Sequence, residues 1–94
     1  MIVAACTLKL QLNGPRSLKD KRRIVKSLTT RLGREFNVAV AEVDHHDVWQ
    51  TVALGLVSVG TDAGFLHSQM ERMVEWIRHT RPDLYVEEVH FELR

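Results

Sequence analysis

The amino-acid sequence predicts an α+β fold in which six elements follow one another in the order β-α-β-β-α-β. Residues 2–12 alternate between apolar side chains and small or polar ones, which is typical of a strand with one buried face. Residues 18–36 and 62–79 instead repeat apolar residues at the period of an α-helix. Residues 37–44, 49–60 and 84–94 are three further strand-like runs. Two right-handed βαβ crossovers then give a four-stranded antiparallel sheet of order 4-1-3-2 with two helices on one face, the ferredoxin-like sandwich.

The first predicted helix, residues 18–36, follows a turn of sequence NGPR. Ser17 is its predicted N-cap, and Asp20 stands three residues later as in an approximate capping box. Its apolar side is formed by Leu18, Val25, Leu28, Leu32 and Phe36, with Ile24 at the margin. Lys21 falls inside this apolar arc, so we expect its stem to lie on the core and its ammonium group to reach water.

The second predicted helix, residues 62–79, is capped by Thr61 or Asp62 and ends before Pro82. Its inward side is predicted to hold Phe65, Leu66, Gln69, Met70, Met73, Trp76 and Ile77. In the last strand, strict alternation places Glu87 with Val89, Phe91 and Leu93. The opposite, open face of the sheet is then predicted to carry Val3, Ala5, Thr7, Lys9, Gln11, Glu88, His90 and Glu92.

Length and composition indicate one small globular domain, residues 1–94. The single cysteine, Cys6, has no internal disulfide partner, which fits a reducing cytoplasm. We find no secretory signal pattern and no apolar run long enough to cross a bilayer, so no membrane association is expected. A domain of this size buries a thin core, and dimerisation would add stability. Small apolar residues such as Ala5, Ala53, Gly55 and Val57 would suit a homodimer through the open sheet face.

The charges of the chain are divided unevenly between its two parts. Residues 1–36 carry nine Lys or Arg and two Asp or Glu, a net charge of +7, whereas residues 37–94 carry four and ten, a net charge of −6. A basic group surrounds the start of the first helix, where free backbone N–H groups also favour anions. We therefore predict a phosphate- or RNA-binding set made of Arg16, Lys19, Lys21, Arg22, Arg23 and Lys26. A merely solvated helix face is the alternative.

The stretch Ala41–Gln50, AEVDHHDVWQ, is rich in groups that could ligate a metal. Its place between two strands favours a hairpin connection, in which the Asp44–Asp47 segment forms a polar turn. Adjacent histidines on a loop tend to point apart, so we predict no metal site. We expect Trp49 to anchor the loop onto a helix end rather than to stack on a ligand. Glu42 lies within a strand and is predicted to pair with a base of the first helix, Lys21 or Arg22.

Three segments of the chain carry a resemblance to a known family. They are GPRSLKDKRRIVKSL, FNVAVAEVDHHDVWQ and LGLVSVGTD, with the strongest similarity in residues 17–23, in residues 36–42 and in the pair Trp49-Gln50. Together they resemble the YlxP-like family of small bacterial proteins, a domain family of unknown function, over nearly the whole chain. The resemblance implies a ferredoxin-like fold and no established activity. Genes of this family often lie beside those of translation initiation and ribosome maturation factors, which implies an association with RNA or ribosomes.

Two functional hypotheses follow. The first is a non-catalytic accessory protein without a cofactor that binds ribosomal RNA or the ribosome through the basic face of the first helix. The second is a dimeric protein-interaction or small-ligand-sensing module that binds no nucleic acid. A third hypothesis, an enzyme that uses the acidic loop, is the least favoured. An acylphosphatase is also disfavoured, because the phosphate loop and catalytic Asn of these enzymes, which share the topology, are not reproduced. The sheet also lacks the aromatic residues on which RNA-recognition motifs stack bases.

Overall fold

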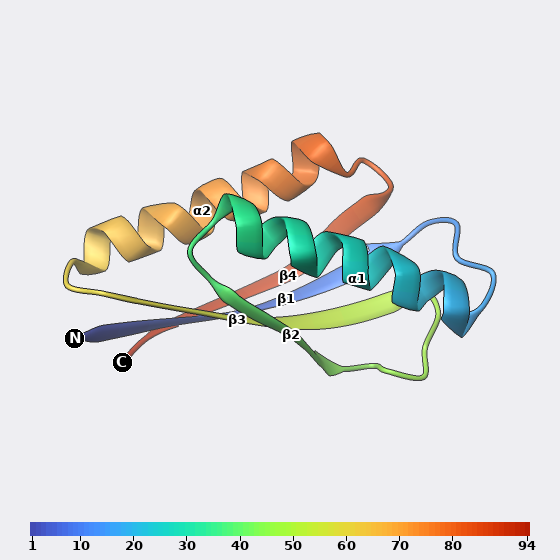
Figure 1. Ribbon diagram of the computed structural model, residues 1–94, viewed down its shortest axis with the longest axis horizontal. Helices are drawn as coiled ribbons and strands as arrows, with labels where there is room; N and C mark the ends of the chain where they lie inside the picture. The colour runs from blue at the N-terminus through green and yellow to red at the C-terminus, as the bar shows by residue number, and fades with distance from the viewer.

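The computed structural model describes residues 1–94 and has the predicted order of elements (Figure 1). They are β1 (Ile2–Leu12), α1 (Leu18–Glu35), β2 (Ala39–Asp44), β3 (Thr51–Gly60), α2 (Ala63–Thr80) and β4 (Leu84–Leu93). The strands form one antiparallel sheet of order β2-β3-β1-β4, and both helices lie on the same face of it. The predicted ferredoxin-like architecture is confirmed.

Strand β1 is the centre of the molecule because it pairs with β3 on one side and β4 on the other. Every second residue from Ala4 to Leu12 is buried against the helices, as the alternation of the sequence predicts. The core is completed by Val52, Leu54 and Leu56 of β3 and by the apolar sides of α1 and α2. The hydrophobic effect of this single layer between sheet and helices holds the domain together.

Both helices begin at the residues that cap them. The Ser17 hydroxyl accepts a hydrogen bond from the Asp20 amide, and the Asp62 carboxylate accepts one from the Phe65 amide. On the inner side of α2, Gln69 is buried as predicted, and its side-chain amide lies 3.2 Å from the Ser58 hydroxyl. Phe65, which was predicted to face inward, is instead 59% exposed. Neither helix combines the length and the apolar composition that crossing a bilayer requires.

Two irregularities interrupt the sheet. The pairing of β1 with β4 shifts by one residue beside Lys9, so that Lys9 faces Glu88 while Leu10 faces Val86. Glu87 therefore lies on the open face, where it accepts a hydrogen bond from Gln11 at 2.6 Å. The strict alternation that placed Glu87 beside Val89 on the core face was wrong at this position. A second shift lies in β2 between Glu42 and Asp44.

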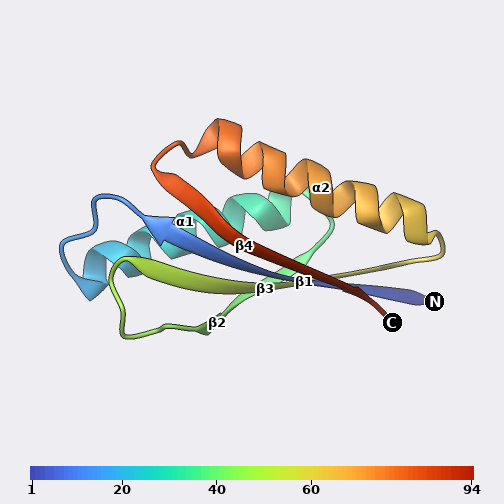
Figure 2. The same ribbon diagram turned by 180° about the vertical axis from the view of Figure 1, so that it is seen from behind.

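The molecule is elongated, with principal extents of 42 × 24 × 21 Å. Its two termini lie together at one end, where Val3 and Arg94 exchange two backbone hydrogen bonds of 2.8 Å (Figures 1 and 2). The opposite end gathers the segment 13–17, the start of α1 and the β2–β3 loop, residues 45–50 (Figure 1). This second end, called the loop end below, carries most of the residues that the sequence singled out.

Candidate nucleic-acid interface

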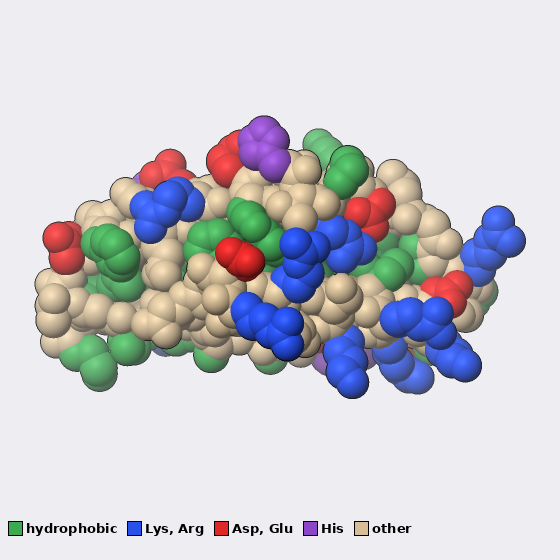
Figure 3. Space-filling model, turned by 45° about the horizontal axis from the view of Figure 1, so that its top comes forward, with side chains coloured by type: hydrophobic (Ala, Val, Ile, Leu, Met, Phe, Trp, Pro, Cys, Tyr) green, Lys and Arg blue, Asp and Glu red, His purple; other side chains and the backbone are tan.

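The basic residues of α1 point away from the sheet. Arg16, Lys19, Arg22, Arg23 and Lys26 are all exposed. We call these five the basic face. At 100° per residue, the four within the helix fall on one side of it, opposite the buried residues Val25, Leu28 and Leu32. Lys and Arg side chains gather along α1 toward the loop end in Figure 3. The structure thus brings five of the six predicted site residues onto one surface.

The cations of this surface have no acidic partners. Thirteen Lys and Arg residues occur in the chain, and five of them form salt bridges: Lys9, Lys21, Arg78, Arg81 and Arg94. Seven of the other eight lie between residues 16 and 34, and Arg72 of α2 is the eighth. Outside residues 16–34, every Lys or Arg except Arg72 lies beside a carboxylate, whereas the exposed cations along α1 have none. Such a surface attracts anions over several ångströms.

One carboxylate stands among these cations. The Asp20 carboxylate accepts a hydrogen bond of 3.2 Å from the backbone N–H of Arg16, and the Asp20 amide donates one to the Ser17 hydroxyl. Asp20 therefore serves the helix start and forms no salt bridge with the basic face. Uncompensated Lys and Arg at a helix N-terminus disfavour the helix by a few tenths of a kcal/mol each. A bound phosphate would offset that cost.

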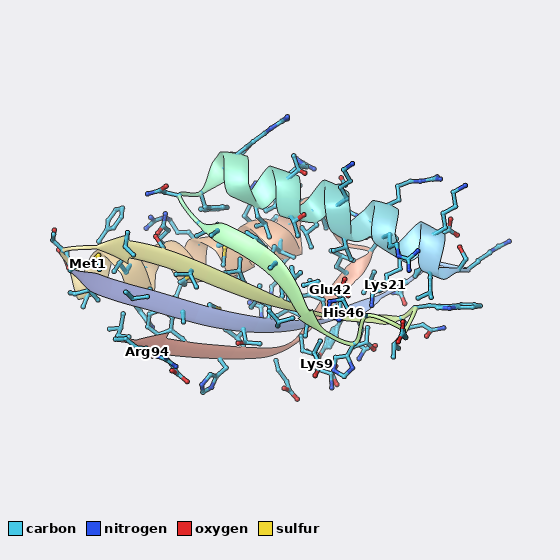
Figure 4. The ribbon with its side chains drawn as sticks, turned by 60° about the horizontal axis from the view of Figure 1, so that its bottom comes forward. Met1, Lys9, Lys21, Glu42, His46 and Arg94 are labelled. Carbon is cyan, nitrogen blue, oxygen red and sulfur yellow. The ribbon has the colours of Figure 1, made fainter.

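Lys21, the sixth predicted site residue, is not on the surface. It is 1% exposed, and its ammonium group lies 3.0 Å from Glu42 Oε2 beneath α1 (Figure 4). The same group donates a hydrogen bond to the backbone carbonyl of His45. The prediction that this ammonium reaches water, and its place in the phosphate-binding set, were wrong, because both of its partners lie inside the protein. The predicted pairing with Glu42 is confirmed.

The Lys21–Glu42 contact is an ion pair by distance rather than a well-formed hydrogen bond. Glu42 Oε2 is buried and has no hydrogen-bond partner of good geometry. Its negative charge is balanced chiefly by the single cation beside it. A buried charge that depends on one partner is costly when that partner is removed.

The β2–β3 loop is the predicted polar turn. His45 has a φ of 62°, in the left-handed region, and its amide donates to Asp44 Oδ1 at 2.8 Å. The Lys21 ammonium group donates a hydrogen bond to the carbonyl of His45, so the first turn of α1 is linked to the start of the loop. No group of three His, Cys, Asp or Glu side chains in the molecule has a metal-binding arrangement. At the start of the loop, His45 Nε2 lies 3.9 Å from Asp44 Oδ2.

Trp49 is partly exposed in this loop, and its anchoring of the loop onto a helix end stays a prediction. Its side chain is 42% exposed, and it takes part in none of the aromatic pairs or cation–π contacts of the protein. The other tryptophan, Trp76, contacts Phe36 edge to face at 6.0 Å and lies beneath Arg31 at 5.1 Å. The loop is tied by Lys21 at one end and, at the other, by a 2.7 Å hydrogen bond from the Leu12 amide to the Gln50 carbonyl.

The open face of the sheet is divided into an apolar half and a charged half. On β2 and β3 it exposes Val43, Val57 and Val59, which are 54%, 42% and 51% exposed. On β4 it carries Tyr85, Glu87, Glu88, His90 and Glu92. No aromatic residue of β1 or β3 faces outward, so this sheet has no base-stacking platform of the RNA-recognition type.

A groove of about 240 Å³ lies between α2 and β4. Met70, Val74 and Phe91 form its apolar floor together with Cys6, and His67, Glu71, Glu75 and Arg78 form its rim. Burial raises the pKa of the Cys6 thiol to about 11, so the reactive thiolate is scarce at neutral pH. On the rim, His67 Nδ1 lies 3.2 Å from Glu71 Oε1, and Arg78 forms a salt bridge with Glu75 at 2.7 Å.

Comparisons with known proteins agree with the resemblance and assign no activity. Residues 3–91 match the model of a family described as "Protein of unknown function (DUF503)". The "Uncharacterized protein YlxP" of Bacillus subtilis (strain 168) is 31% identical over 61 residues, which span 65% of this chain and 66% of that protein. Among solved structures, "De novo designed protein Foldit4" aligns with a TM-score of 0.50 and 18% identity, covering 99% of this chain and 94% of the design. This last similarity concerns the fold alone.

Proposed function

The chain belongs to the DUF503 family of proteins of unknown function, and we propose that it is a non-catalytic accessory protein that binds RNA, ribosomal RNA in particular, through the basic face of α1. The observation that carries this proposal is the accumulation of unpaired cations along one helix, in a chain whose net charge is only +1. Phosphate contacts supply affinity without sequence readout, so the partner is recognised chiefly by its backbone.

Two further features support this proposal. The cysteine that could act as a nucleophile is buried and protonated, which favours a binding role over a catalytic one. A free buried thiol also suits the reducing cytoplasm, where ribosomes are found. The gene neighbourhood of the family points in the same direction by association.

The test is a fluorescence-anisotropy titration of labelled ribosomal RNA fragments at salt concentrations from about 50 mM upward. If the basic face makes about four phosphate contacts with single-stranded RNA, log affinity falls against log salt with a slope of about −3. The variant Arg23→Glu/Lys26→Glu should lower affinity strongly for all sequences alike, with a shallower slope. Its melting temperature should stay close to that of the wild type, because both side chains are exposed.

The matched control compares two single variants that change the net charge equally. Arg23 and Arg72 are both exposed arginines without a salt bridge, but Arg72 lies on α2. Arg23→Glu should reduce affinity much more than Arg72→Glu. Equal losses would mean that only net charge matters, and absence of binding by the wild type at low salt would refute the proposal.

A second candidate function is favoured by the apolar half of the open sheet face. Val43, Val57 and Val59 would be covered if two copies packed their sheets together, giving a dimeric interaction module. Sedimentation at micromolar concentration should then show a species near twice 10.8 kDa. Val57→Lys/Val59→Lys should dissociate it, whereas Phe65→Lys, an exposed apolar residue on α2, should not. A wild-type monomer would remove this candidate.

A further inference from the structure

Trp49 is 42% exposed and belongs to the β2–β3 loop, which lies at the loop end together with the start of α1. Lys21 ties residue 45 to the first turns of α1, and Leu12, next to the segment that leads to Arg16, ties residue 50. Trp49 thus belongs to a loop that is fixed at both ends, and His46 of the same loop lies near Lys21 of α1 (Figure 4). An exposed indole on a fixed loop is pre-organised for a flat ligand, because the loop loses little conformational entropy when the ligand binds.

We propose that Trp49 is a stacking platform for an unpaired base of the RNA whose phosphates contact the basic face; this inference rests on the proposed function above. Aromatic side chains beside a basic groove are a common means of binding single strands, because every base has a π-face. A duplex hides those faces by stacking its own bases. The ligand class is therefore single-stranded RNA, such as a loop or a bulge.

The charges near Trp49 support a base rather than a phosphate at this position. Asp44 ends β2 and Asp47 lies in the loop, so both carboxylates stand within five residues of Trp49 in the sequence and repel phosphate. The uncharged base is the part of a nucleotide that fits beside them, and a carboxylate can accept hydrogen bonds from its amino groups. The arrangement divides the ligand into two parts, with the backbone along α1 and a base over the loop.

The contrast with Trp76 argues against a purely structural role for Trp49. Trp76 is half-buried, and its ring contacts Phe36 edge to face and Arg31 in a cation–π contact. Trp49 has no aromatic or cationic partner of this kind within the protein. Exposing a large apolar ring on a fixed loop is unfavourable for the isolated protein, and a stacked base would cover it.

The test uses a Trp76→Phe background, in which Trp49 is the sole tryptophan reporter. Probes are a single-stranded oligoadenylate, the corresponding RNA duplex and inorganic polyphosphate of similar charge. Trp49 fluorescence should be quenched by the single strand, and much less by the duplex or by polyphosphate. In the wild-type background, Trp49→Ala should weaken single-strand binding about 5-fold to 100-fold, as loss of one stacked base does. It should leave polyphosphate affinity and the salt slope unchanged.

The possible outcomes separate this inference from the proposed function. If oligoadenylate binds in a manner that depends on Arg23 and Lys26 but leaves Trp49 fluorescence unchanged, the stacking role is refuted and the proposed function stands. If Trp49→Ala weakens polyphosphate and RNA binding equally, Trp49 is a structural residue of the loop. Partial recovery of affinity in Trp49→Phe would support stacking. If no probe binds the wild type at low salt, both proposals fail.

Discussion

Replacing Lys21 by methionine should destabilise the protein more than any substitution on the basic face. Methionine keeps most of the buried stem but removes the ammonium group, which leaves Glu42 without its counter-charge and the His45 carbonyl without its donor. At 3.0 Å and an effective dielectric constant of about 20, the attraction that is lost is about 5–6 kcal/mol. Breaking a buried pair costs about 3–5 kcal/mol net. Because the Glu42 side chain is 19% exposed, water can relax part of this, and we expect a loss of about 3 kcal/mol.

Urea unfolding followed by circular dichroism measures this loss directly. A loss of about 3 kcal/mol is a large share of the roughly 5–10 kcal/mol expected for a domain of this size. The corresponding fall in melting temperature is about 12–24 °C. The exposed neighbour provides the control, since Arg22→Met should change the free energy of unfolding by no more than about 0.5 kcal/mol.

A double-mutant cycle decides whether the cost arises from the pair. Glu42→Leu alone leaves the Lys21 ammonium buried opposite an apolar group and should also destabilise the protein. In Lys21→Met/Glu42→Leu neither charge remains, so the double variant should be more stable than the sum of the single losses predicts, by about 2–3 kcal/mol. Strictly additive losses, or a single Lys21→Met cost below about 1 kcal/mol, would refute the reasoning from burial and distance.

Three further predictions concern other parts of the molecule. Gly14 has a φ of 113° and open space around its Cα, so Gly14→Ala should cost about 1–2 kcal/mol from backbone strain alone, as measured by urea unfolding. Cys6 should not react with a thiol reagent at pH 8 until the protein unfolds, because burial raises its pKa to about 11, and rapid labelling of the native state would contradict the structure. The hydrogen bond from the Arg81 side chain holds the pKa of Asp83 below its usual value. The ionised Asp83 therefore stabilises the folded protein above about pH 4, and this contribution is lost as the pH falls through the lowered pKa. The difference in stability between wild type and Asp83→Asn should therefore shrink in acid, and a difference that grows there would reverse this assignment.

The order and extent of the elements were predictable because their signals are local. Ser17 and Asp62 cap their helices, and the alternation in residues 2–12 identifies the central strand. The bulge at Glu87 was missed because strict alternation was carried through the last strand. A signal was present, since the apolar residues Val86 and Val89 are three positions apart rather than two. A β-bulge adds one residue to a strand, so the apolar residues on either side of it are separated by three positions instead of two.

The candidate site was predictable as a charged segment but not as a surface. Helical periodicity placed Lys21 in the apolar arc. Whether its ammonium group reaches water, however, depends on which residues of other elements cover the end of the side chain. That is decided by Glu42 and His45, which are more than twenty residues away along the chain. The exposure of Trp49 depends on the same tertiary arrangement, in which Lys21 binds the His45 carbonyl of the same loop.

The closeness of the two chain ends in space has a practical consequence. Residues 3 and 94 are directly hydrogen-bonded, while α1 starts and the β2–β3 loop turns at the other end of the long axis. An affinity tag, fluorophore or surface linker attached at either end would therefore stand clear of the residues to be tested. A short peptide joining the ends would also permit circular permutation, with new ends opened elsewhere. Placing the new ends between residues 45 and 50 would open the loop that carries Trp49 and would interrupt none of the four strands or two helices.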